Sequence, residues 1–122
     1  MTVQTAPTTF DIAALVAAIE NRDAEGQLAA YTPDAELVVV DHEHPPSNPQ
    51  VIRGSDALLA HFTDVCARDM THHVTTAALV DDRLTIELAC EYADGTRVAC
   101  LCVSGIEGDR IAWQRGLQAW DH

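Results

Sequence analysis

The second half of the chain is built from four apolar stretches that are separated by short turn signals. These signals are Asp81-Asp82, Asp94-Gly95 and Gly108-Asp109, and Asp-Gly between apolar runs is a pair typical of a tight β-hairpin. Strands that such turns connect pair in the antiparallel direction. Residues 71–120 therefore predict four consecutive antiparallel strands, at 71–80, 84–92, 97–106 and 111–120.

The first half carries helical spacing instead. Apolar residues recur every three or four positions in two stretches, which predicts helices at about 10–21 and from Gly54-Ser55 onward. A shorter helix is expected after Asp23, whose side chain can cap it. The Val-rich residues 35–41 predict a strand, and three prolines in residues 41–50 exclude continued pairing there. Three helices ahead of hairpin-connected strands must cover one face of the sheet, so the predicted class is α+β.

Charge and length exclude several classes of protein. The 122 residues carry a formal net charge of −12, with seven Arg and no Lys, so neither nucleic acid nor a membrane surface is an expected partner. No apolar run reaches the roughly 18 residues of a membrane span, and no secretion signal is visible, which favours a cytoplasmic protein. One domain is expected at 10–122, behind a flexible segment at 1–9. The four cysteines are expected to be reduced.

Four short motifs then occur in a characteristic order. They are Tyr31-Thr-Pro-Asp34-Ala35, Gly54-Ser-Asp-Ala57, Tyr92-Ala-Asp-Gly95-Thr-Arg-Val98 and the terminal Trp120-Asp121. In this order and spacing, residues 10–121 resemble the SnoaL-like branch of the nuclear-transport-factor-2-like superfamily. The resemblance implies a cone-shaped, curved antiparallel sheet wrapped around three N-terminal helices, with an interior pocket. It also implies a homodimer and no cofactor.

The resemblance implies a function in general terms. Enzymes of the superfamily include ketosteroid isomerases, polyketide cyclases, epoxide hydrolases and dehydratases, whereas other members only bind ligands or associate. We therefore expect a small hydrophobic or aromatic metabolite as ligand and acid–base chemistry on it. The alternative is a non-catalytic ligand-binding or dimerisation domain of the same fold. The isomerases carry a catalytic aspartate where this chain has Val39, and Asp41 lies two residues later on the same strand face.

The turns also predict which side chains face the interior, because register determines facing. A two-residue turn at Gly108-Asp109 places Arg115 opposite Cys102, directs Trp113 and Arg115 inward and directs Trp120 outward. A three-residue loop at 93–95 gathers Cys90, Cys100 and Cys102 on one apolar face, whereas a two-residue turn would separate Cys90 from the other two. The turn at Asp81-Asp82 directs His73 inward, and a different register would direct His72 there.

The side chains that are predicted to face the interior supply the candidate site residues. Asp41 is the expected base, His73 its partner acid and Arg115 the anchor for an anion or carbonyl group. Burial is expected to raise the pKa of Asp41, whereas Arg115 would lower this pKa if it lay close. The cysteine cluster and the His42-Glu43-His44 segment are weak metal signals, and no metal site is predicted. The expected ligand-binding residues are Val39, Phe62, His72, Tyr92, Cys102, Trp113 and Asp121.

The strand at 97–106 is apolar on both faces, which bears on assembly. Val98, Cys100 and Cys102 share one face, and Ala99, Leu101 and Val103 share the other. One face can pack on the helices, but the other then needs a cover. A second subunit would supply that cover, so the sequence predicts a homodimer.

Overall fold

The computed structural model describes residues 10–121, so the predicted flexible segment at 1–9 lies outside the described residues. The helices are α1 (Ile12–Glu20), α2 (Ala24–Leu28) and α3 (Ser55–Ala67). Six strands form one sheet in the order β2-β1-β6-β5-β4-β3. The bounds of the strands are β1 Tyr31–Val40, β2 Gln50–Arg53, β3 Met70–Val80, β4 Arg83–Tyr92, β5 Arg97–Glu107 and β6 Arg110–Trp120.

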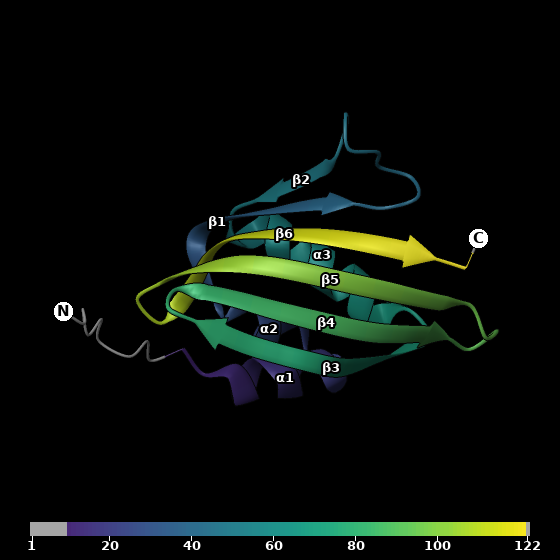
Figure 1. The fold of residues 1–122 in the computed structure, drawn as a ribbon, viewed down its shortest axis with the longest axis horizontal. Coiled ribbons are helices and arrows are strands. Elements are labelled where there is room, and N and C mark those ends of the chain that lie inside the picture. The colour runs from purple at the N-terminus through teal and green to yellow at the C-terminus, as the bar shows by residue number, and fades with distance from the viewer. Residues whose placement is uncertain (1–9, 122) are drawn as a thin grey trace.

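The predicted α+β class with a curved sheet is confirmed, but the sheet is mixed. The helices lie on one side of the sheet, behind it in Figure 1. Every ladder is antiparallel except the one between β1 and β6, where Val38 pairs with Arg115 in parallel. The prediction of a purely antiparallel sheet is therefore wrong at this ladder. No hairpin links β1 to β6, so no turn constrains their relative direction.

Local signals explain where the helices begin. Asp11 caps α1 by accepting a hydrogen bond from Ala14 N, and Asp23 caps α2 by accepting one from Gly26 N, as predicted for Asp23. Gly54 precedes α3 with φ of +88°, a conformation that favours glycine. None of the described helices combines the length and apolarity that a membrane crossing requires.

The core lies between the helices and the helix-covered face of the sheet, which is called the inner face below. It brings Leu15 of α1 and Leu58 and Phe62 of α3 against apolar side chains of β1, β4 and β6. The sheet side chains in this cluster include Leu37, Val39, Leu84, Ile86 and Ile111. Burial of such side chains stabilises each by about 1.5–3 kcal/mol, so this contact holds the layers together.

The predicted hairpin turns are confirmed. Val80 pairs with Arg83 across the Asp81-Asp82 turn, and Glu107 pairs with Arg110 across Gly108-Asp109. Cys90 pairs with Val98, as the three-residue loop at 93–95 requires. Cys90, Cys100 and Cys102 therefore share the inner face.

A β-bulge in β6 corrects the predicted facing of that strand. Ile106 pairs with Ile111, but Gly105 pairs with Trp113, so Ala112 is an extra residue. From Trp113 onward each side chain is turned to the face opposite to the predicted one. Trp113 and Arg115 face outward and Trp120 faces inward. The bulge keeps Ile111 buried and removes a guanidinium from the core, where its burial would be costly.

A second bulge corrects β3. Val74 pairs with Leu88 and Thr76 with Glu87, which leaves Thr75 unpaired in the ladder. Leu79 faces inward as predicted, but His72 rather than His73 faces inward beyond the bulge. His73 is exposed and lies 3.2 Å from the Glu20 carboxylate of α1.

Candidate ligand cavity between the helices and the sheet

A cavity of about 140 Å³ lies between the inner face of the sheet and the helices. A cavity of similar size in another protein holds benzene, so the space suits a small ring or a short chain. Its wall is mostly apolar, and a limited set of polar side chains interrupts it. The residues in the wall with a polar or thiol group are Gln27, Tyr31, His61, Arg68, His72, Cys90, Tyr92, Cys100, Cys102, Gln114, Gln118 and Trp120.

Gln114 of β6 is the centre of a buried hydrogen-bond network. Its Oε1 accepts bonds from the hydroxyls of Tyr31 at 2.8 Å and Ser104 at 2.9 Å. Burial, and then the nearby Cys102, raise the pKa of Tyr31 far above its ordinary value, so the phenol stays protonated and remains a donor. With Oε1 engaged twice, the Nε2 group of Gln114 retains two N–H donors at the cavity wall.

His72 of β3 and Cys90 of β4 form a second polar group in the wall. His72 Nδ1 lies 3.2 Å from Cys90 Sγ. Its other ring nitrogen, Nε2, is buried and has no hydrogen-bond partner among the described residues. A buried polar atom without a partner costs about 1–3 kcal/mol, so a ligand that bonds to this nitrogen would gain affinity.

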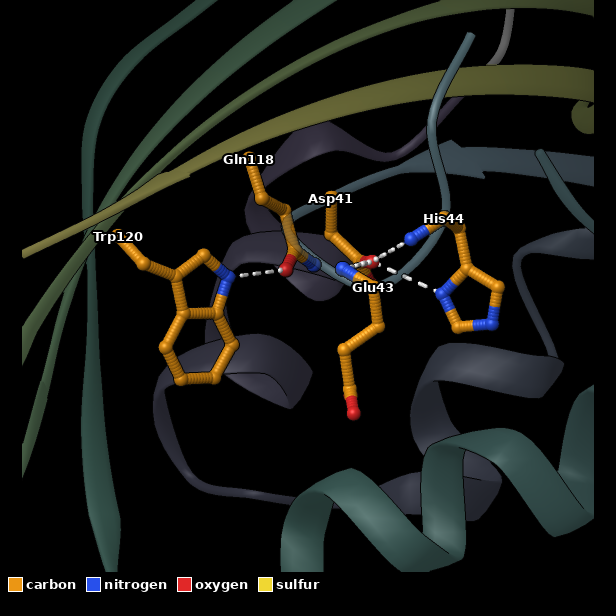
Figure 2. A network of polar contacts seen from close by, with 5 residues as sticks. All are labelled: Asp41, Glu43, His44, Gln118 and Trp120. Carbon is orange, nitrogen blue, oxygen red and sulfur yellow. Dashed lines mark hydrogen bonds and ion pairs between the residues drawn. The ribbon is translucent and has the colours of Figure 1, made fainter. Parts of the chain in front are cut away.

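Aromatic side chains close one end of the cavity. The Trp120 ring lies 4.2 Å from the His42 ring and 5.6 Å from the Tyr92 ring. Its Nε1 donates to Gln118 Oε1 at 3.1 Å, as Figure 2 shows. Arg68, which directly follows α3, donates to the Tyr92 hydroxyl at 3.1 Å. The indole that was predicted to point outward therefore belongs to the cavity wall.

Asp41 is engaged by the loop that follows β1 rather than by the cavity. Its Oδ1 accepts bonds from the backbone N of Glu43 and of His44 and lies 2.8 Å from His44 Nδ1 (Figure 2). Burial raises the pKa of Asp41, but the hydrogen bonds and the charge of His44 outweigh burial and lower it. The predicted rise in this pKa is therefore wrong.

The other candidate residues divide between the cavity and the surface. Val39, Phe62, His72, Tyr92 and Cys102 line the cavity. The outward-facing Trp113 ring lies under the guanidinium groups of Arg83 at 5.0 Å and Arg115 at 5.3 Å.

Asp121 lies at the end of the sheet and accepts a bond from Arg97 N at 2.8 Å. The predicted trio of Asp41, His73 and Arg115 is thus not gathered at the cavity. The residues that the prediction missed include Tyr31, Gln114, Gln118 and Trp120. For the three on β6 the missing signal was the bulge at Ala112.

No group of His, Cys, Asp and Glu within residues 10–121 has an arrangement that could hold a metal ion. The side chains at the cavity wall supply amide and hydroxyl groups, two imidazoles, one guanidinium group and three thiols.

The fold is that of the nuclear-transport-factor-2-like superfamily. The chain belongs to its SnoaL-like domain family, whose model matches residues 12–114. No curated protein has a significant sequence match to this chain.

Solved structures share the fold at low sequence identity. A nuclear-transport-factor-2-like protein of unknown function from Mesorhizobium loti has a TM-score of 0.71 at 15% identity, covering 84% of this chain and 82% of its own. A candidate ketosteroid isomerase from Kribbella flavida has a TM-score of 0.70 at 14% identity, covering 88% and 73%. A loop-truncation variant of IdmH has a TM-score of 0.63 at 23% identity, covering 90% and 89%. At these identities the similarity shows the fold alone.

Proposed function

We propose that this protein binds a small, mostly apolar metabolite in the cavity and that Gln114 anchors a carbonyl oxygen of the ligand. The supporting observation is that Gln114 Oε1 accepts two hydrogen bonds, one from Tyr31 and one from Ser104. The N–H groups on Nε2 are then left to donate to a ligand. An amide donor in an apolar cavity selects a ligand with one acceptor on an apolar body. A volume of about 140 Å³ suits a single ring.

A second function, proton transfer on the bound ligand, is favoured by His72. Its Nε2 is buried without a partner among the described residues, and an imidazole nitrogen can accept or donate a proton. With the carbonyl held at Gln114, His72 would move a proton next to that carbonyl, as an isomerase, cyclase or dehydratase requires. Asp41 is a weaker candidate for this role because its carboxylate is held by the loop and its pKa is lowered.

Binding can be tested with cyclohexanone, whose single ring carries one carbonyl group. We expect cyclohexanone to bind more tightly than methylenecyclohexane, which has the same shape but no acceptor oxygen. Gln114→Glu keeps an acceptor oxygen for Tyr31 and Ser104 but removes the N–H donors. Gln114→Met removes the acceptor oxygen as well as the N–H donors. Both variants should lose about tenfold in cyclohexanone affinity, the worth of one hydrogen bond of about 1.4 kcal/mol. Calorimetric titration measures this difference.

The control for this test is Gln50→Met, because Gln50 lies in β2 outside the cavity wall. Its affinity for cyclohexanone should equal that of the unmodified protein. Equal affinities for cyclohexanone and methylenecyclohexane in the unmodified protein would contradict the anchoring role of Gln114.

We also propose that the protein is a homodimer through the outer face of β5 and β6. Leu101, Val103 and Leu117 are exposed there by 46%, 38% and 57%. Leu101 and Leu117 pair across the two strands, so these side chains form a continuous apolar patch. The same patch on a second subunit would cover it.

A further inference from the structure

Three of the four cysteines line one cavity, and one of them touches a histidine. Cys90, Cys100 and Cys102 lie in the wall, and Cys90 Sγ is 3.2 Å from His72 Nδ1. The fourth, Cys66, lies on α3 outside the wall, where its sulfur accepts a hydrogen bond from Gln27. A cysteine that is buried only to fill a core needs no imidazole beside it.

The three thiols in the wall differ in pKa. A hydrogen bond donated by Cys100, together with the contact to His72, lowers the pKa of Cys90 even though burial raises it. The same bond and burial raise the pKa of Cys100. Burial raises the pKa of Cys102 to about 11. Of the three thiols, only Cys90 has a lowered pKa, and its sulfur is the one that lies against an imidazole nitrogen.

The register argues against a disulfide between Cys90 and Cys100. Cys90 pairs with Val98, whereas Cys100 pairs with Leu88, so the two cysteines are diagonal neighbours. Diagonal positions on adjacent strands are roughly 7–8 Å apart, which is beyond the Cα separation that a disulfide usually spans. Cys90 is therefore not placed to be consumed in a disulfide with Cys100.

We propose that Cys90 is a nucleophile that adds to a small α,β-unsaturated carbonyl compound in the cavity, with His72 as its acid–base partner. The Cys90 sulfur forms a bond to the β-carbon of the ligand, and the carbon–carbon π bond breaks. Its electron pair moves to the α-carbon and carbonyl oxygen as an enolate, and the proton that His72 takes from the Cys90 thiol is delivered to the α-carbon. A thiol and an alkene thus become a thioether, and no oxidant or reductant is needed.

The polar groups of the wall match the charge that develops in this step. The enolate oxygen gains negative charge, and the Nε2 atom of His72 and the Nε2 donors of Gln114 lie in the same wall. The inference rests on the proposed function to the extent that the ligand carbonyl is bound in this cavity. It goes further by naming an electrophilic ligand class and a covalent step.

Cyclohexenone is the probe that tests this step, because it adds the conjugated double bond to the ring of cyclohexanone. The protein is incubated with cyclohexenone at neutral pH, and peptide mass spectrometry locates the adduct. We expect one adduct, on Cys90, formed at least tenfold faster than any adduct on Cys66. His72→Gln should slow labelling of Cys90 by roughly 10²-fold, the lower range for loss of a general acid–base partner.

Matched variants separate chemistry from structure. Cys90→Ser should abolish the adduct, and Cys66→Ser, outside the wall, should leave the labelling of Cys90 unchanged. Circular dichroism and thermal melting check that each variant is folded. An adduct mainly on Cys66 or Cys102, or a labelling rate at Cys90 that His72→Gln does not change, would overturn the inference.

The two proposals fail in different ways. If cyclohexanone binds but cyclohexenone leaves Cys90 unmodified, the covalent step is wrong and ligand binding stands. If cyclohexanone does not bind and Cys90 is unmodified, both proposals are wrong. An adduct on Cys90 without measurable cyclohexanone binding would support the nucleophile and contradict the role of Gln114 as the anchor.

Discussion

Asp41 illustrates how surroundings determine what a single carboxylate does. Its side chain is 12% exposed, which by itself would favour the neutral acid. Two backbone amides and His44 bond to the same oxygen, and together they hold the carboxylate ionised. The loop after β1 is therefore organised around a charge.

This arrangement predicts that Asp41→Asn lowers stability and that the loss depends on pH. At neutral pH we expect the variant to lose about 1–2 kcal/mol in free energy of unfolding, because the bond to His44 is to a charged acceptor. The pKa of Asp41 is lowered in the folded protein, so its contribution is fully present above the ordinary value of 3.8 and is lost as pH falls through the lowered pKa. The difference between variant and unmodified protein should shrink from pH 7 to about pH 3.

Urea unfolding at both pH values measures the difference. Asp109→Asn is the matched control, because Asp109 lies in an exposed turn and should change stability little at either pH. A loss that is equal at both pH values would show that the shape of the Asp41 side chain matters and its charge does not.

At the scale of elements, two bulges decide which side chains reach the cavity. The bulge at Ala112 directs Gln114, Gly116 and Gln118 inward, and the bulge at Thr75 directs His72 inward. Each bulge adds one residue to a strand and reverses the facing of the residues beyond it.

The bulge in β6 also places Trp113 directly over Gly105 on the outer face. A methyl group on Gly105 would collide with the indole ring of Trp113, whereas one on Gly116 would lie 3.5 Å from Cys102 Sγ in ordinary contact. We therefore expect Gly105→Ala to lower the free energy of unfolding by about 1–3 kcal/mol, as overpacking does. Gly116→Ala is the control and should lose less than about 1 kcal/mol. Thermal unfolding compares the two variants, and equal losses would show that the indole moves aside freely.

At the scale of the whole molecule, the sheet has one face covered by helices and one face open. The open face carries the apolar patch of Leu101, Val103 and Leu117. A small acidic protein that leaves such a patch in water invites self-association, so the proposed dimer follows from the layer arrangement.

The dimer predicts that Leu117→Arg yields a folded monomer. Leu117 is 57% exposed in the single chain, so the change should leave the fold intact while placing two cations against each other in the interface. Light scattering should report a dimer for the unmodified protein and a monomer for the variant at micromolar concentration. Val80→Arg is the control, because Val80 is 68% exposed but lies at the end of β3, away from the patch. A monomer mass for the unmodified protein would contradict the dimer.

The sequence by itself determined the α+β class, the family and the positions of the hairpin turns, whereas the pairing of Cys90 with Val98 selected between the two registers that the sequence allowed at 93–95. The class, the family and the turns depend on local signals: turn residues, apolar periodicity and short motifs, each of which acts within a few positions. The position of Asp41 at the end of β1 was equally visible from the sequence, but its engagement with His44 was not.

Only the tertiary structure decided which residues line the cavity. A bulge has little effect on the free energy of folding and leaves no clear mark in the sequence. The extra residue at Ala112 nevertheless turns Arg115 away from the cavity and turns Gln114 and Gln118 toward it. The parallel pairing of β1 with β6, and the contact of His72 with Cys90, likewise depend on strands brought together by the packing of the whole domain. Burial of Ile111 and exposure of Arg115 are satisfied together only when that packing is complete.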